Sequence, residues 1–277
     1  MVKGMIEILK AILFGIVEGI TEWLPISSTG HMILLDEFVK LDVSPEFLGM
    51  FLVVIQLGAI LAVVVLFWNK LFPFRFKEKP IVQKDIFSMW FKIVAACIPA
   101  AVVGIFFDET FEALFYNPIS VAIALIVFGI AFLVIENRNK SLHPKITALS
   151  EITYKTAMII GVFQLIAAVF PGTSRSGATI IGALLIGVSR TVAAEFTFFM
   201  AVPVMLGASL LKILKFGFAF TGAEMVILFV GMLVAFLVSV IVIRFLMSYI
   251  KKHDFKVFGW YRIVLGILVL AYFYLIK

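Results

Sequence analysis

Residues 225–243 read MVILFVGMLVAFLVSVIVI, a run with a single serine and no charged side chain. About 20 such residues in an α-helix cross the hydrocarbon core of a bilayer, which is about 30 Å thick. Five further stretches are similarly long and apolar. They are Phe47–Trp68, Trp90–Phe107, Ile119–Ile135, Val192–Leu214 and Trp260–Ile276. The runs lack the alternation of barrel strands, so we expect an all-α polytopic membrane protein with six transmembrane helices.

The composition of the 277-residue chain excludes a soluble globule. Hydrophobic residues make up 63% and charged residues 14%, against about 45–50% and about 25% in soluble domains. The single Cys97 excludes an intramolecular disulfide and a thiolate metal cluster. Glu7, Lys10 and Glu18 interrupt the first apolar stretch, which argues against a cleavable signal peptide.

The basic residues gather in loops and predict the orientation of the chain. Residues 69–89, 136–155 and 250–259 carry Lys and Arg side chains and are expected on the cytoplasmic side. Residues 36–46 and 108–118 are mainly acidic and are expected outside. The net charge of +6 therefore indicates membrane topology and no nucleic-acid partner.

Two segments, residues 5–35 and 156–188, are apolar at their ends and broken in the middle. Each must enter and leave on one side, so we predict two re-entrant helix-turn-helix elements. A sparse self-similarity pairs Gly15 with Gly161, Pro25 with Pro171, and Ser28 with Ser174. It indicates one integral membrane domain, residues 1–277, made of inverted repeats 1–140 and 141–277, with a polar site at the bilayer midplane where the broken elements meet.

The first broken segment reads EGITEWLPISSTGH from Glu18 to His31. Glu18 and Glu22 lie four apart, so on a helix both carboxylates project from one face and can share a cation or a proton. Pro25 then ends the helix, and hydroxyl groups and free amides precede His31, as in phosphate sites at helix N-termini. Acidic residues inside a membrane indicate a functional site. The alternatives are an interfacial segment with its carboxylates in water and a merely packed His31.

The second broken segment reads PGTSRSGAT from Pro171 to Thr179. Arg175 lies in its hydroxyl-rich turn, and an arginine at membrane depth needs an anionic partner, for which phosphate oxygens are suited. The alternative is an internal salt bridge to Glu18 or Glu22. A divalent cation, an anion cradle and a nucleophile are the parts of phosphoryl-transfer chemistry. A substrate that reaches such a site from the bilayer is expected to be a lipid phosphate.

These two motifs resemble the signatures of the undecaprenyl-diphosphate phosphatase, or bacitracin-resistance, family of bacterial membrane proteins, and the resemblance covers essentially the whole chain. It implies hydrolysis of undecaprenyl diphosphate, a polyprenyl diphosphate lipid, to undecaprenyl phosphate, which recycles the carrier for peptidoglycan synthesis. It also implies a divalent cation, magnesium or calcium, and a multi-pass protein of the bacterial cytoplasmic (inner) membrane with its site facing outward. A lipid flippase or secondary transporter is the alternative function, and a homodimer stays open.

The resemblance also implies roles for individual residues. Glu18 and Glu22 become the acidic pair that holds the metal, Ser28 or His31 the nucleophile, and Arg175 a member of the diphosphate clamp. If Ser28 attacks, Glu22 or His31 is expected to act as the base. Six hydroxyl residues of the turns are expected to contact the substrate, with Ser174 and Thr179 part of the diphosphate clamp. They are Ser27, Thr29, Thr173, Ser174, Ser176 and Thr179.

Overall fold

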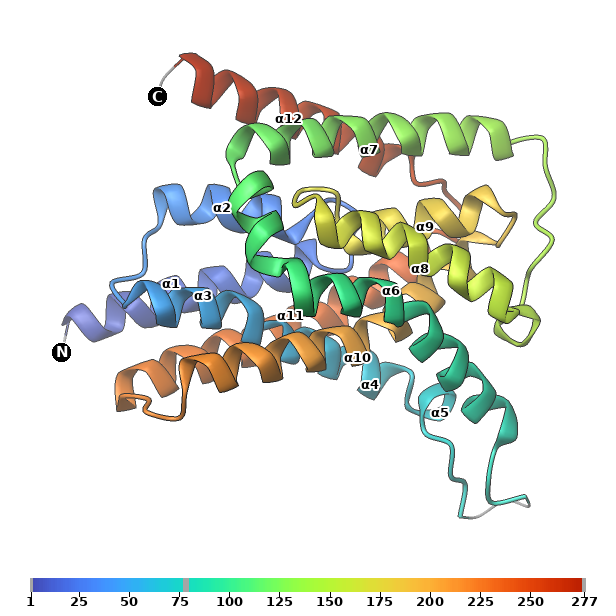
Figure 1. The fold of residues 1–277 in the computed structure, drawn as a ribbon, viewed down its shortest axis with the longest axis horizontal. Helices are drawn as coiled ribbons and strands as arrows, with labels where there is room; N and C mark the ends of the chain where they lie inside the picture. The colour runs from blue at the N-terminus through green and yellow to red at the C-terminus, as the bar shows by residue number, and fades with distance from the viewer. Residues whose placement is uncertain (1, 77–79, 276–277) are drawn as a thin grey trace.

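The computed structural model describes residues 2–76 and 80–275, which form α-helices joined by short loops (Figure 1). The first part of the chain contains α1 (Val2–Thr21), α2 (Ser28–Phe38), α3 (Pro45–Val54), α4 (Gln56–Leu66), α5 (Trp68–Leu71), α6 (Lys84–Phe115) and α7 (Pro118–Asn139). The second part contains α8 (Tyr154–Val169), α9 (Arg175–Leu185), α10 (Arg190–Phe216), α11 (Gly222–Tyr249) and α12 (Lys256–Leu275). A short 3-10 helix, Leu149–Glu151, precedes α8.

The prediction of six transmembrane helices is confirmed. Within the described residues, six helical stretches are long and apolar enough to cross a bilayer. They are Pro45–Leu66, Lys84–Phe107, Pro118–Asn139, Arg190–Phe216, Gly222–Tyr249 and Lys256–Leu275. The first combines α3 and α4, which meet at Ile55 in a nearly helical conformation. Ile276, the expected end of the last span, lies outside the described residues.

Helix α6 is longer than the sequence predicts. Residues 108–115, expected in an outward loop, continue this helix to Phe115. The rings of Phe107, Phe111 and Phe115 follow at four-residue intervals, with centroids 6.2 Å apart at each step. Phe115 also packs on Phe170 at the end of α8, with centroids 4.9 Å apart. The prediction of a loop was wrong because ring contacts at four-residue intervals favour a continued helix and Phe115 anchors its end on Phe170.

The two broken segments form helical hairpins. Helices α1 and α2 make the first, which opens toward the left of Figure 1, and α8 and α9 make the second, which opens toward the right. Their turns meet near the centre of the molecule, where hydrogen bonds join them. Helices α8 and α9 have only 16 and 11 residues. Re-entry into a bilayer and the inverted repeat stay predictions.

Helices of the two halves pack on each other. Helix α1 lies on α11, α8 on α6, α12 on α7, and α10 on both α3 and α4. The approach is close where glycine lies at the crossing. A Cβ atom on Gly58 would lie 2.0 Å from the carbonyl oxygen of Met232, and one on Gly161 would lie 2.2 Å from that of Ala96. Small residues at such crossings allow the backbone contacts that join helices within membranes.

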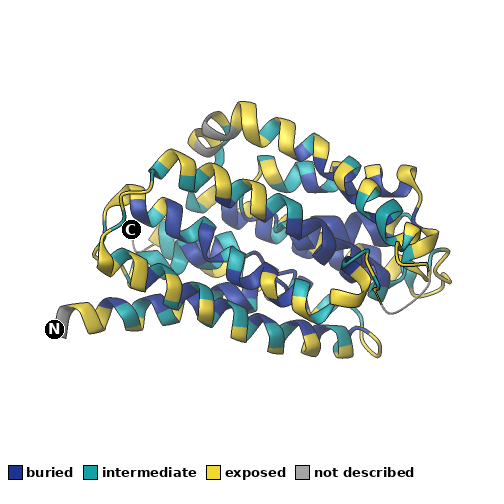
Figure 2. Cartoon of the chain, turned by 90° about the horizontal axis from the view of Figure 1, so that it is seen from below, coloured by how far each residue is buried: buried dark blue, intermediate teal, exposed yellow. Residues whose placement is uncertain are grey.

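Burial divides the molecule into a closed interior and an apolar outer surface (Figure 2). Trp23 of the first turn is fully buried and meets Phe198 edge to face, with ring centroids 5.1 Å apart. On the outer faces of the spans, the side chains of Phe106, Phe229 and Ile241 are between 66% and 72% exposed. Large apolar side chains at such exposure require a lipid environment.

Candidate active site

Both turns end in a strained serine. Ser27 and Ser174 are the N-cap residues of α2 and α9, with φ angles of 76° and 70°. The side chain of each accepts a hydrogen bond from a glycine amide three residues on, at 3.3 Å from Gly30 and 3.1 Å from Gly177. Positive φ is uncommon outside glycine and persists where the surrounding structure enforces it, often at functional sites.

The caps also correct the register of the sequence comparison. The comparison paired Ser28 with Ser174, whereas the helix caps pair Ser27 with Ser174. The second turn is one residue longer, because two residues separate its proline from the cap and only one separates them in the first turn. Arg175 therefore occupies the position after the cap that Ser28 occupies in the first hairpin.

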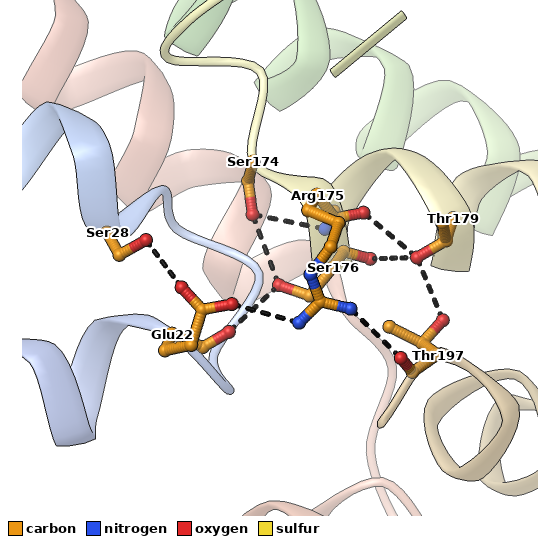
Figure 3. Close-up of polar contacts among 8 residues, drawn as sticks. Glu22, Ser28, Ser174, Arg175, Ser176, Thr179 and Thr197 are labelled. Carbon is orange, nitrogen blue, oxygen red and sulfur yellow. Dashed lines mark hydrogen bonds and ion pairs between the residues drawn. The ribbon is translucent and has the colours of Figure 1, made fainter. Parts of the chain in front are cut away.

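Glu22 is the point where the two turns meet (Figure 3). Its side chain is almost fully buried, and its two carboxylate oxygens accept from different partners. Arg175 Nη2 donates to Oε1 at 2.9 Å, and Ser28 Oγ donates to Oε2 at 2.6 Å. Ser176 Oγ donates to the Glu22 backbone oxygen at 3.2 Å. The expected proximity of Arg175 to the acidic pair is therefore present, as an ion pair with Glu22.

A span residue outside both motifs supports Arg175. Arg175 Nη1 donates to the backbone oxygen of Thr197 in α10 at 2.9 Å, and the Thr197 hydroxyl donates to Thr179 Oγ1 at 2.9 Å. Thr179 is fully buried, and its own hydroxyl donates to the carbonyl oxygens of Arg175 and Ser176. Sequence reasoning missed Thr197, whose only signal was a hydroxyl inside an apolar run.

The other expected substrate contacts occupy different surroundings. Thr29 lines a pocket at the first turn. The hydroxyls of Ser174 and Ser176 lie 3.2 Å apart beside Arg175. Thr173 is fully buried, and its hydroxyl has no hydrogen-bond partner among the described residues. The diphosphate clamp stays a prediction.

Glu18 faces the pocket at the first turn, whose volume is about 310 Å³. Its side chain is 1% exposed, and Oε1 accepts no hydrogen bond within the described residues. Ser28, Thr29, Gln56 and Lys212 line the same pocket. A buried carboxylate oxygen without a donor is suited to a hard cation, for which oxygen ligands are preferred. The described residues contain no cluster of three or more His, Cys, Asp and Glu, so a cation here would also need oxygens from water or substrate.

The ring nitrogens of His31 contact partners other than Ser28. Its Nδ1 lies 2.7 Å from the backbone oxygen of Ser27, and its Nε2 lies 2.7 Å from the hydroxyl of Tyr261 in α12. The His31 and Tyr261 rings are stacked, with centroids 5.7 Å apart and planes inclined by 6°. No hydrogen bond in the described part of the chain joins His31 to Ser28 or Glu22. The structure thus places Ser28 beside a carboxylate and His31 beside a phenol.

Arg262, the residue after Tyr261, is fully buried between the two turns. Its guanidinium donates to the backbone oxygens of Pro25 in the first turn, at 3.2 Å, and of Gly172 and Thr173 in the second, at 3.0 and 2.7 Å. Two more acceptors belong to α7. They are the carbonyl oxygens of Ala124 and Leu125. Sequence reasoning missed Arg262 because it was counted as the third residue of an apolar span.

Comparison with known proteins shows the family of this chain. Residues 11–268 match the family model described as bacitracin resistance protein BacA. An undecaprenyl-diphosphatase of Desulfitobacterium hafniense is 68% identical over 270 residues, which cover 98% of this chain and 97% of the relative. An undecaprenyl-diphosphatase 1 of Clostridium acetobutylicum is 67% identical, over 98% of this chain and 99% of the relative. An undecaprenyl-diphosphatase of Enterococcus faecalis is 66% identical, over 98% of each chain. With its six membrane-spanning helices and a match along nearly its whole length, this multi-pass membrane protein belongs to the bacitracin resistance protein BacA family.

Proposed function

We propose that this protein is a membrane phosphatase that hydrolyses undecaprenyl diphosphate to undecaprenyl phosphate and phosphate. The names of its relatives support this substrate and favour hydrolysis over the carrier alternative. The observation that carries the proposal is the contact of Ser28 Oγ with Glu22 Oε2, at 2.6 Å, beside the guanidinium of Arg175. A hydroxyl on a carboxylate next to an anion ligand is an arrangement for phosphoryl transfer.

The contacts favour Ser28 over His31 as the nucleophile. Ser28 Oγ attacks the terminal phosphorus while its proton passes to Glu22, which already accepts its hydrogen bond. The bond from phosphorus to the bridging oxygen breaks, and undecaprenyl phosphate leaves with that oxygen and the proton that Glu22 had taken. Glu22 then accepts a proton from water, the resulting hydroxide attacks the phosphoserine, phosphate leaves, and Glu22 returns the proton to Ser28 Oγ. In the structure, by contrast, His31 Nε2 contacts Tyr261.

Arg175 is proposed to bind the diphosphate. Its Nη2 and Nη1 contact Glu22 and Thr197, and its buried Nε has no acceptor among the described residues. An unused donor on the guanidinium that pairs with Glu22 can bind a phosphate oxygen, and the planar guanidinium suits bidentate recognition. Lys212, which lines the pocket at Glu18 and Ser28, adds a second positive charge near the path of the substrate.

A divalent cation is proposed as a cofactor, held by Glu18. The free Oε1 of this carboxylate is its available ligand, whereas both Glu22 oxygens already accept hydrogen bonds. A bound Mg²⁺ or Ca²⁺ would neutralise charge on the diphosphate. The sharing of the cation by both carboxylates stays a prediction.

The proposed location is the bacterial cytoplasmic membrane, with the site open to the outside and the product returned to peptidoglycan synthesis. The basic loops support this orientation. Labelling in whole cells tests it at Thr29, which lines the pocket, rather than at the buried Ser27. A Thr29→Cys variant with Cys97 replaced by alanine should react with an impermeant thiol reagent; protection in cells and labelling only in broken cells would contradict outward access. A homodimer stays a prediction.

The function is tested by phosphate release from undecaprenyl diphosphate with purified protein in detergent. The wild type is expected to release one phosphate per lipid and to yield undecaprenyl phosphate. Ser28→Ala should abolish release and also the labelled phosphoprotein trapped by acid quenching. A phosphoprotein labelled at His31 would reverse the assignment of the nucleophile, and absence of release by the wild type would contradict the function.

A further inference from the structure

We propose that Tyr261 is a positioning residue of this active site, acting through His31 on the backbone that carries Ser28. The inference rests on the proposed function and adds a residue from α12, outside both sequence motifs, to the catalytic apparatus. It also assigns His31 a positioning role in place of nucleophile or base.

The hydrogen bonds fix the tautomer of His31. The backbone oxygen of Ser27 can only accept, so Nδ1 carries the proton and donates to it at 2.7 Å. In the neutral ring Nε2 is then an acceptor, and the Tyr261 hydroxyl donates to it at 2.7 Å. Stacking of the two rings restrains the imidazole further. Tyr261 therefore orients the side chain that grips the Ser27 carbonyl.

That carbonyl belongs to the peptide bond between Ser27 and Ser28. Ser27 has a φ angle of 76°, a conformation that its neighbours must impose on it. The direction of the Ser28 side chain depends on this peptide plane, and Ser28 Oγ lies 2.6 Å from Glu22. The contacts thus run without a break from Tyr261 through His31 and the Ser27 carbonyl to the serine hydroxyl. Displacement of a reacting group by about 1 Å can lower a rate about 100-fold.

The start of α12 is rigid enough for this role. Arg262, next to Tyr261, is fully buried and donates to backbone oxygens of both turns. Just before α12 begins, the Phe255 amide donates to the buried Glu136 carboxylate at 3.0 Å, and Glu136 is also paired with Arg190. Tyr261 is therefore fixed relative to both turns by its neighbours, although its own side chain is 44% exposed.

Tyr261→Phe removes the hydroxyl and keeps the stacked ring. We expect kcat to fall about tenfold with KM changed less than about twofold, because the substrate ligands remain in place. Tyr272→Phe, on the same helix and in contact with Phe38, is the matched control and should leave both constants unchanged. If Tyr261 acts only through His31, the His31→Ala variant should lose no further activity when Tyr261→Phe is added.

Two further measurements separate positioning from chemistry. His31→Asn keeps an amide donor that can reach the Ser27 carbonyl, so it should retain at least about ten times the kcat of His31→Ala; a nucleophile or base would not be rescued. Hydrogen exchange followed by mass spectrometry reads the turn without any substrate. Deuterium uptake in the peptide containing residues 27–31 should rise in Tyr261→Phe and stay unchanged in Tyr272→Phe.

The kinetic and exchange measurements together test the proposed role of Tyr261. Wild-type kcat together with wild-type deuterium uptake in Tyr261→Phe would overturn it, and so would fully multiplicative losses in the double variant with His31→Ala. Lack of phosphate release by the wild type would count against the proposed function alone, since the exchange measurement would still show whether Tyr261 holds the turn.

Discussion

Single and double substitutions of Glu22 and Arg175 distinguish the contribution of this ion pair to stability from its contribution to catalysis. The two side chains are only 6% and 13% exposed, and Nη2 lies 2.9 Å from Oε1. Removal of one partner of such a pair leaves a buried charge uncompensated and costs about 3–5 kcal/mol, whereas replacement of both by apolar groups is often nearly neutral. We expect Glu22→Leu and Arg175→Met each to lower the free energy of unfolding by about 3 kcal/mol. The double variant should lie within about 1 kcal/mol of the wild type.

The assay is denaturant unfolding in mixed micelles, followed by tryptophan fluorescence. Trp23, the residue after Glu22, is fully buried against Phe198 and reports on the first turn. Substitution of Lys256 by methionine is the control, because Lys256 pairs with Asp254, whose side chain is 32% exposed and stays in contact with solvent when its partner is lost. This change should cost less than about 1 kcal/mol.

Phosphate release is measured on the same variants. All three site variants should be inactive, including the stable double variant, because each lacks the base, the phosphate ligand or both. Additive destabilisation in the double variant would show that the two groups do not compensate each other and would refute the ion-pair argument. Activity in the double variant would refute the mechanism.

Four further predictions concern single residues. Gly58→Ala should destabilise the protein by about 1–3 kcal/mol, because its Cβ would meet the Met232 carbonyl, whereas Gly207→Ala should be neutral, because nothing lies within 4 Å of its Cβ; equal thermal unfolding of the two variants would contradict the packing. Ser28→Ala should lower kcat by at least about 100-fold, measured as phosphate release, and a smaller loss would exclude a nucleophilic role. After treatment with a chelator, Glu18→Gln should need at least about ten times more Mg²⁺ than the wild type for half-maximal activity, and an unchanged requirement would place the cation elsewhere. Arg262→Met should lower the free energy of unfolding by about 3 kcal/mol, because buried carbonyl oxygens lose their donor, and wild-type stability in denaturant would show that the carbonyls find other partners.

The sequence predicts the spans well because their requirement is local. A helix in lipid needs about 20 apolar residues whatever its neighbours are, so length and composition suffice. The end of α6 escaped prediction because it depends on Phe115 packing against Phe170 from another hairpin. A contact between residues far apart in the sequence cannot be predicted from the sequence of one helix.

The sequence predicted which residues form the site but not which of them contact each other. Glu22 and Arg175 could be expected to meet, because isolated charges at membrane depth need compensation. The choice of Glu22 over Glu18 as the partner of Arg175, and the pairing of His31 with Tyr261, depend on how the hairpins approach. Arg262 was not predicted as a site residue for a different reason. An arginine near the end of an apolar run ordinarily extends its charge to the interface, whereas here it is enclosed by carbonyl oxygens.

The two turns share one framework and differ in charge. Each has a serine cap with positive φ, yet the first presents a carboxylate before its cap and the second a guanidinium after it. A buried ion pair is weak evidence of stabilisation, because desolvation offsets the attraction. In the proposed phosphatase, the role of the Glu22–Arg175 ion pair is that the substrate can replace Glu22 as the partner of Arg175. A diphosphate that binds Arg175 competes with Glu22 for the guanidinium, and the released carboxylate keeps Ser28 Oγ as its donor. In the proposed mechanism, the carboxylate released from Arg175 is then the group that accepts the serine proton.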